Sequence, residues 1–186
     1  MTPAELCKSG SEHGEQRALF AWCAMAEAYG FDAAWDERSY RDKGCEAFYG
    51  AGRPEHNPVP ELKWFHAIPN GGSRGNDAKS RAIAGAMLKA EGVKRGIPDC
   101  FLPVPMWAVT EVGPQLKLPF RCILYAGLYV EMKRAKSEGR AKGTTSSEQD
   151  DCIAWLRHSG YAVSVCFTWD QAARELQSYI EAVRKL

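Results

Sequence analysis

The chain has 186 residues, of which 45% are hydrophobic, and a formal net charge of +1. This composition is typical of one globular domain and excludes a disordered chain. The longest nearly apolar run, residues 122–130, is far shorter than the roughly 20 residues that span a bilayer, and the polar N-terminus lacks the apolar stretch of a secretory signal.

The N-terminal part of the chain predicts one long helix followed by an irregular insertion. Ser9 and Glu12 match a capping box, and apolar residues recur after them at helical spacing. Glycine commonly follows the last turn of a helix, so we expect this helix to end at Gly30. Residues 32–60 form a predicted insertion, in which a short helix over 36–48 precedes a loop rich in glycine and proline.

The middle of the chain changes from helical to extended patterns. A short strand is predicted over 62–68, and a helix over 80–91 follows it. Residues 100–104 form the next short strand, and residues 121–133 are apolar enough for a long strand in the centre of a sheet. The segment between them, 105–120, is predicted to be a hairpin insertion.

Two helices and one strand complete the predicted fold. Ser146 and Gln149 match a capping box at the start of a helix. Residues 161–167 follow as a strand, and Thr168 caps a final helix that extends almost to the end of the chain. This order of elements predicts a single α/β domain over residues 1–186, with a small mixed β-sheet flanked by helices.

Two acids and a lysine lie close to predicted strand ends. Asp99 closes a Gly-Ile-Pro-Asp turn before one strand, while Glu131 and Lys133 lie two residues apart on one face of the next. Two carboxylates and a backbone carbonyl, here that of Met132, are the hard oxygen ligands that Mg²⁺ prefers. Such a metal lowers the pKa of bound water, and a lysine beside it can stabilise charge on a phosphate. A solvated strand end with an ion pair is the alternative.

Other residues near these motifs are candidates for contact with phosphate. His66 and Asn70 flank a turn in which the backbone at Gly71 can approach a phosphate, with a plain turn as the alternative. Because the net charge is near zero, DNA binding requires a local basic patch. The predicted patch, which is otherwise only a solvated face, comprises Arg74, Lys94, Arg95, Arg134, Lys136, Arg140 and Lys142.

Cysteines and histidines supply no competing motif. The seven cysteines never occur as CxxC, and the four histidines lack HxH or HExxH spacing. The sequence therefore disfavours a zinc site and a disulfide framework, and it favours the reducing cytoplasm.

Five blocks of the sequence carry a family resemblance. The blocks are residues 11–22, 66–72, 92–103, 127–136 and 146–165. In this order they closely resemble the VRR-NUC (virus-type replication-repair nuclease) family of PD-(D/E)xK nucleases. The resemblance implies a restriction-endonuclease-like (PD-(D/E)xK) core. The separation of Asp99 from Glu131 is wider than the family pattern, which we attribute to the hairpin insertion.

The resemblance also implies roles for individual residues. Asp99 and Glu131 would ligate Mg²⁺ or Mn²⁺, and Lys133 would be the catalytic lysine. Gln149 matches the active-site glutamine of the family, which steadies the lysine or a phosphate; closing the Ser146 capping box is the alternative.

An acid on the first helix completes the site in this family, and both Glu12 and Glu15 qualify. We favour Glu12 because it lies one turn before Gln16 and shares its face. Favourable charge at a helix N-terminus is the alternative for both acids.

The function implied is a metal-dependent DNA endonuclease for branched DNA that leaves a 5′-phosphate and a 3′-hydroxyl. Stand-alone members of the family resemble homodimers that resolve four-way (Holliday) junctions, and two symmetric incisions require two sites. A dimeric resolvase in a bacterial or phage-infected cytoplasm is therefore the specific expectation. A flap or nicking nuclease and a non-catalytic DNA-binding module are the alternatives. The tryptophans proposed for the dimer interface, unless they pack internally, are Trp22, Trp35, Trp107 and Trp155.

Overall fold

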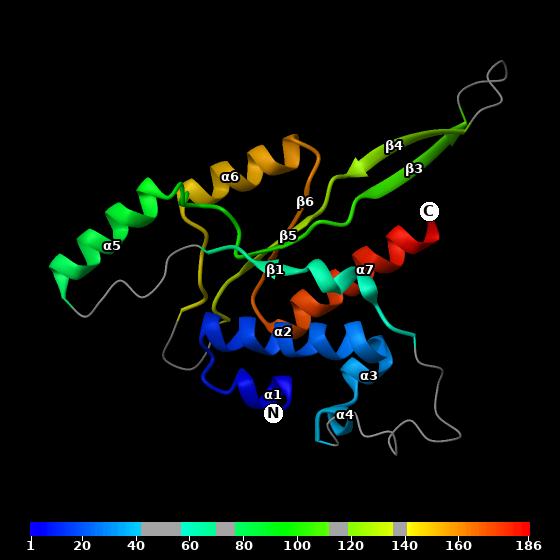
Figure 1. Ribbon diagram of the computed structural model, residues 1–186, viewed down its shortest axis with the longest axis horizontal. Helices are drawn as coiled ribbons and strands as arrows, with labels where there is room; N and C mark the ends of the chain where they lie inside the picture. Colours follow the sequence, from blue (N-terminus) through cyan, green and yellow to red (C-terminus); the bar gives the residue numbers. More distant parts are fainter. Residues whose placement is uncertain (42–56, 70–76, 112–118, 136–140) are drawn as a thin grey trace.

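The computed structural model describes residues 1–41, 57–69, 77–111, 119–135 and 141–186, and it contains a small mixed sheet with helices on both faces (Figure 1). The strands of this sheet lie in the order β1 (His66–Ala67), β2 (Cys100–Leu102), β5 (Leu128–Met132) and β6 (Ala162–Cys166). Strand β2 pairs in antiparallel fashion with both of its neighbours, β1 and β5, and β6 is parallel to β5. The predicted mixed α/β sheet flanked by helices is confirmed.

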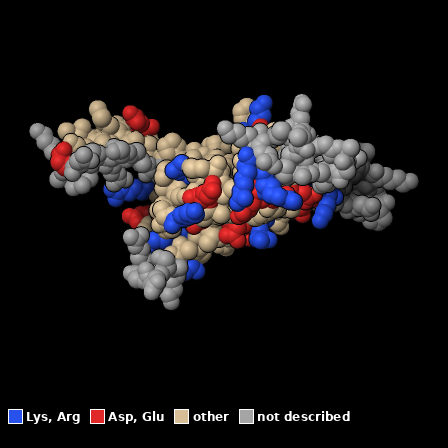
Figure 2. All heavy atoms as spheres, turned by 90° about the horizontal axis from the view of Figure 1, so that it is seen from below, with Lys and Arg blue, Asp and Glu red and all other residues tan. Residues whose placement is uncertain are grey.

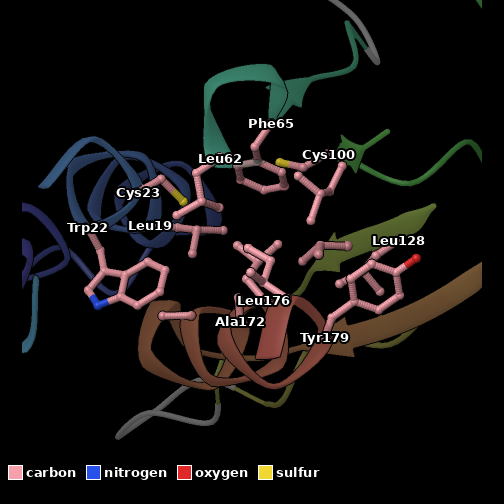
Figure 3. Close-up of a cluster of buried hydrophobic side chains, with 14 of the residues drawn as sticks. Leu19, Trp22, Cys23, Leu62, Phe65, Cys100, Leu128, Ala172, Leu176 and Tyr179 are labelled. Carbon is pink, nitrogen blue, oxygen red and sulfur yellow. The ribbon is translucent and has the colours of Figure 1, made fainter. Parts of the chain in front are cut away.

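The main hydrophobic core lies between this sheet and two long helices. Helices α2 (Glu12–Tyr29) and α7 (Trp169–Lys185) pack together against one face, and α6 (Ser147–His158) covers the other face at β6 (Figure 1). Buried side chains from both helices, the sheet and the segment before β1 meet in this core, as Figure 3 shows for Leu19, Trp22, Leu62, Cys100, Leu128 and Leu176. The core fixes the strand ends that carry the candidate site.

The predicted capping box of Ser9 and Glu12 is wrong. Ser11 is the N-cap of α2, and its side chain accepts a hydrogen bond from the Gly14 N–H at 3.1 Å. The Ser9 hydroxyl contacts the Ser11 hydroxyl at 2.8 Å instead. Gly30 follows the helix as predicted, with φ +98°, a conformation that favours glycine.

Short helices surround this long one. The predicted insertion begins with α3 (Phe31–Trp35) and α4 (Glu37–Arg41). Part of the helix predicted over 36–48 is therefore present, and its remainder lies outside the described residues. Helix α1 (Pro3–Leu6), which the sequence did not predict, precedes α2.

Two of the four tryptophans assigned to a dimer interface pack inside the molecule, so this part of the prediction is wrong. The ring centroids of Trp22 and Trp35 lie 5.2 Å apart, and Trp35 also contacts Trp169 at 5.7 Å. Trp107 and Trp155 are 40% and 64% exposed. Of the four tryptophans, only Trp107 and Trp155 stay candidates for a dimer interface.

The strand predicted over 62–68 is reduced to the two residues of β1. The preceding residues form a 3-10 helix, η2 (Pro60–Trp64), in which Pro60 supplies the helical φ at the first position. Leu62 and Phe65 are buried in the main core. These apolar positions reflect a buried helical turn and not an extended strand.

The long central strand predicted over 121–133 is wrong. The chain forms two strands, β4 (Pro119–Tyr125) and β5, which are separated at Gly127. A Cβ at Gly127 would lie 2.7 Å from the Leu102 carbonyl oxygen, so a larger residue would clash there. Strand β4 pairs with β3 (Met106–Glu111) in a hairpin that projects from the body (Figure 1). The predicted hairpin is therefore present in its described part.

Helix α5 (Ala78–Ala90) projects from the opposite side of the molecule to the hairpin (Figure 1). Asp77 caps its first turn, and the predicted caps of α6 and α7, Ser146 and Thr168, are confirmed. Within the described residues, no helix is long and apolar enough to cross a membrane.

Candidate active site

The end of β5 carries a buried ion pair. Glu131 and Lys133 lie two residues apart, so both side chains leave the strand on one face, and Lys133 Nζ lies 2.8 Å from Glu131 Oε1. Glu131 is 1% exposed and Lys133 is 8% exposed. Charged side chains are almost never buried to this extent unless they are paired. The alternative of a solvated ion pair is therefore wrong.

Gln149 joins this pair from the first turn of α6. Its Oε1 accepts hydrogen bonds from Lys133 Nζ at 2.8 Å and from the Ser146 N–H at 3.0 Å. Its Nε2 donates a hydrogen bond to Glu131 Oε1. The side chain that closes the capping box therefore also contacts the lysine and the carboxylate, so capping is not its only contact, and its role as an active-site glutamine stays a prediction.

Asp99 lies beside this network, on the turn that leads into β2. The pairing of β2 with β5 places it at the same edge of the sheet as Glu131. Asp99 Oδ2 accepts a hydrogen bond from the Met132 N–H at 2.9 Å, and the Asp99 carbonyl accepts one from the Ile68 N–H at 2.7 Å. The structure thus brings Asp99 next to Glu131 and Lys133, which lie on a separate segment of the sequence.

The Gly-Ile-Pro-Asp turn rests against the start of α6. Gly96 has φ +84°, and a Cβ there would lie 2.4 Å from the Glu148 carbonyl oxygen. Pro98 in the same turn is buried. The turn that carries Asp99 and the helix end that carries Gln149 can approach this closely only because residue 96 is glycine.

The charges at this site are incompletely compensated. Burial raises the pKa of the Glu131 carboxyl, the hydrogen bond from Lys133 lowers it, and the negative charge of Asp99 raises it. Glu131 Oε2 is buried and has no hydrogen-bond partner among the described residues. A divalent cation between Asp99 and Glu131 would satisfy this oxygen and offset the repulsion between the two carboxylates.

The donor set fits Mg²⁺ or Mn²⁺. In the part of the chain that the structure describes, no group of three or more His, Cys, Asp or Glu side chains is placed to hold a metal. Mg²⁺ needs no such cluster, because it is commonly held by one or two carboxylates and retains several waters. Asp99 and Glu131 supply two carboxylates. The Met132 carbonyl stays a predicted third ligand, in the residue whose N–H binds Asp99.

The two acids of α2 have different neighbours. Glu12 Oε1 accepts a hydrogen bond at 3.1 Å from the N–H of Arg134, the residue after Lys133. Glu15 is buried, and its Oε2 accepts a hydrogen bond from the Trp169 N–H at 2.7 Å, at the start of α7. The structure places Glu12 beside the site and Glu15 at another helix. A role of Glu12 toward the metal stays a prediction.

Two members of the predicted basic patch, Lys94 and Arg95, are exposed on the turn before Asp99. In the face that Figure 2 shows, Lys and Arg side chains lie beside Asp and Glu side chains and form no continuous basic surface. Three further members of the patch lie outside the described residues, namely Arg74, Lys136 and Arg140.

Arg134 and Lys142 instead contact other parts of the protein. Arg134 Nη2 donates a hydrogen bond to the Ala141 carbonyl at 3.4 Å. Lys142 Nζ lies 3.5 Å from the centroid of the Phe167 ring.

His66 lies exposed on β1, and its Nδ1 is 2.8 Å from the Trp64 carbonyl oxygen. It lines a cavity of about 570 Å³ together with His13, Gln16 and Arg17 of α2. Asn70 and Gly71, the other members of the predicted phosphate turn, lie outside the described residues.

Sequence reasoning missed two groups of residues around the site. His13 and Arg17 line the cavity at His66, and their spacing of four residues on a helix is the signal that could have placed them together. Phe167 and Arg157 line a second cavity at Lys133. The signal for Phe167 is its position directly after β6, which runs parallel to β5 and ends at the same edge of the sheet.

A search of solved structures finds a protein described as "VRR_NUC domain protein". It aligns with a TM-score of 0.43 and 20% sequence identity, over 74% of this chain and 84% of that chain. The chain is similar to it. No protein-family model matches the sequence, and no curated protein matches it. The chemistry of the candidate site is argued from the side chains of this chain alone.

Proposed function

We propose that this chain is a Mg²⁺- or Mn²⁺-dependent DNA endonuclease with a PD-(D/E)xK site formed by Asp99, Glu131 and Lys133. The observation that carries this proposal is the buried pair of Glu131 and Lys133, bound by the half-buried Gln149, beside Asp99. An ion pair that served stability alone would not need a second acid next to it or a buried carboxylate oxygen without a partner. Both features are expected of a site that binds a cation.

Each residue has a defined part in the proposed reaction. Asp99 and Glu131 hold the cation, which when bound lowers the pKa of a water molecule and draws charge from the phosphate. Lys133 is fixed between Glu131 and Gln149, where its ammonium can stabilise negative charge that develops on a phosphate oxygen. Gln149 restricts the lysine to one position, so that little reorganisation is needed during the reaction.

Branched DNA, and specifically the four-way (Holliday) junction, is the substrate that we propose. The exposed Lys94 and Arg95 lie at the start of the turn that leads to Asp99, and they support contact with a phosphate backbone at the site. The preference for a junction comes from the resemblance of the sequence to the VRR-NUC family.

A homodimer is part of this proposal, because two symmetric incisions need two sites. Large apolar side chains on the projecting elements support it. Ile83 and Met87 on α5 are 51% and 62% exposed, and Ile123 and Leu124 on β4 are 52% and 46% exposed. Light scattering at micromolar concentration is expected to give twice the chain mass, whereas a species of 20.6 kDa would rule out the dimer.

The direct test is a cleavage assay with four-way junction, flap, single-stranded and linear duplex DNA. Wild type is expected to make paired nicks in the junction with Mn²⁺ and none in chelator. Lys133→Met is expected to be inactive, while Asp151→Asn, which changes an exposed acid on α6, keeps full activity. Preference for the flap would replace the resolvase by a flap nuclease. Failure to cleave any DNA form would leave a binding module.

A further inference from the structure

A second cavity opens directly beside Lys133. Its volume is about 440 Å³, within the range of about 300–1,000 Å³ that is usual for small-ligand sites. The loop before α6, α6 itself and the end of β6 form its walls. The side chains that matter for its chemistry are Lys133, Lys142, Thr145, Asp150, Arg157 and Phe167.

Strand topology places this cavity next to the proposed cleavage site. Strands β5 and β6 are parallel, and the Lys133 N–H donates a hydrogen bond to the Cys166 carbonyl at 2.7 Å. Phe167 is the next residue, so its ring lies at the same edge of the sheet as the Lys133 side chain. Both residues line the cavity, and a ligand there would lie within reach of a phosphate at the metal site.

The Phe167 ring is not required by the hydrophobic core. Phe167 is only half-buried and belongs to neither buried cluster. The Lys142 ammonium lies over its face at 3.5 Å from the ring centroid. A cation over an aromatic face gains favourable energy at such a distance, so the Lys142 ammonium occupies the ring face that borders this polar cavity.

The remaining wall of the cavity supplies both hydrogen-bond donors and hydrogen-bond acceptors. Arg157 Nη2 donates a hydrogen bond to the Val163 carbonyl at 2.9 Å, which fixes the guanidinium at the cavity. Asp150 Oδ1 accepts a hydrogen bond from the Thr145 hydroxyl at 2.6 Å, and the other lone pairs of this carboxylate can accept from the N–H groups of a base. An aromatic face, two cations and an acceptor are the groups that a nucleotide requires.

We propose that this cavity binds one unpaired nucleotide next to the scissile phosphate. The base stacks on Phe167, and Lys142 leaves the ring to bind a phosphate with Arg157. The inference rests on the proposed nuclease function and adds to it a preference for DNA that offers an unstacked nucleotide, as a branch point or a single strand does.

The test compares binding of two probes in chelator, where cleavage is absent. The probes are a short oligothymidylate and the same sugar–phosphate backbone without bases. Stacking on an aromatic side chain contributes about a 5- to 150-fold gain in affinity per base. Wild type is therefore expected to prefer the oligothymidylate within that range, and Phe167→Ala is expected to bind the two probes equally.

Two further variants keep the test specific. Phe167→Leu retains an apolar side chain without an aromatic face, so it is also expected to lose the preference even if the alanine variant folds poorly. Trp64→Ala is the matched control, because Trp64 also lies under a lysine, with Lys63 Nζ 5.5 Å from its ring centroid, but does not line this cavity. It is expected to keep the wild-type preference.

The salt dependence of binding distinguishes the contribution of the cations from that of the Phe167 ring. Lys142→Ala is expected to flatten the slope of log affinity against log salt by about 0.7, the value for one lost phosphate contact on a single strand, while Phe167→Ala leaves the slope unchanged. Equal affinity of wild type for both probes, no binding of either, or an unchanged preference in both Phe167 variants would overturn the proposal. None of these outcomes depends on cleavage, so they are distinguishable from failure of the nuclease proposal.

Discussion

The candidate active site carries buried charged side chains, whereas the two projecting elements carry exposed apolar side chains. At the site, Glu131 and Lys133 are charged and buried, whereas on α5 and the β3–β4 hairpin Met87 and Ile123 are large, apolar and exposed. Burying the charged side chains costs folding free energy unless they are paired, whereas the exposed apolar side chains gain none from burial. The charged pair is held on several sides by the sheet, α6 and the Gly96 turn. The apolar side chains of α5 and the hairpin have few residues of their own chain to pack against.

This difference indicates that the first region must hold a fixed geometry, whereas the second must expose apolar surface. The buried charged pair keeps its geometry because its partners are fixed, Glu131 by the sheet and Gln149 by the capping box of α6. Exposed apolar side chains on a projecting helix gain nothing inside one copy of the chain. Variants in the first region are therefore expected to change chemistry, and variants in the second to change assembly.

The largest expected effect is the loss of cleavage when the site loses a charge. Asp99→Asn and Glu131→Gln each remove the charge of a proposed metal ligand with little change of shape, so DNA cleavage in Mg²⁺ is expected to fall by about 100-fold or more. DNA binding in chelator is expected to persist. Cleavage by Asp99→Asn at the wild-type rate would show that the site is wrongly assigned.

A second expectation concerns the turn that positions Asp99. Gly96→Ala adds a Cβ at 2.4 Å from the Glu148 carbonyl in a left-handed conformation, and it is expected to cost about 2–4 kcal/mol of unfolding free energy. Gly160→Ala is the matched control, because Gly160 has the same φ of +84° but open space around it. It is expected to cost only about 1–2 kcal/mol. Equal losses in denaturant titrations would mean that the contact with α6 is unimportant.

The projecting elements are expected to respond differently. Ile83→Ser and Met87→Ser change exposed side chains on α5, so the unfolding free energy of the chain at low concentration is expected to stay within about 0.5 kcal/mol of wild type. If α5 belongs to a dimer interface, the same variants lower the mass measured by light scattering. A large loss of stability with unchanged mass would instead indicate that α5 packs within its own chain.

The smallest effect is expected at Glu15. Burial raises the pKa of its carboxyl, and the charge of Asp170 acts in the same direction against the hydrogen bond from the Trp169 N–H. The folded chain therefore holds the proton more tightly than the unfolded chain, and stability decreases as pH rises from the ordinary carboxyl value of 4.5 through the higher folded value.

Glu15→Gln removes this cost while keeping an acceptor for the Trp169 N–H. The variant is expected to melt at a higher temperature than wild type at pH 7, with the difference shrinking as the pH falls below about 4.5. Glu12→Gln is the matched control on the same helix; it is expected to leave the melting profile unchanged and to lower cleavage. A Glu15→Gln variant that melts below wild type at every pH would contradict this account.

Local signals predicted much of the fold. The caps at Ser146 and Thr168, and the glycine after α2, depend on nearest neighbours in the chain, and each is present. The break at Gly127 could not be predicted in this way. It depends on the close approach of the Leu102 carbonyl, a residue of another strand, while the apolar run around it is equally suited to one strand or two.

In the candidate site too, some features could be predicted from local sequence, whereas others depend on contacts between distant segments. Glu131 and Lys133 share a face because of their spacing on one strand, and this pair could be placed from the sequence alone. The different neighbours of Glu12 and Glu15 could not be predicted from the sequence, because both residues lie in the first turn of α2. Glu15 gains its partner, the Trp169 N–H, only when α7 packs against that helix. The cavity at Phe167 likewise arises from the parallel pairing of two strands that are far apart in the chain.

The most direct test of the central claim is Mn²⁺ binding measured by calorimetry without DNA. Wild type is expected to bind one Mn²⁺ ion per chain, because the proposal places one cation at Asp99 and the buried Oε2 of Glu131, which has no hydrogen-bond partner among the described residues. Glu131→Gln is expected to abolish that binding, and Asp151→Asn to leave it intact. Equal binding of Mn²⁺ by wild type and Glu131→Gln, or no binding by wild type, would contradict the assignment.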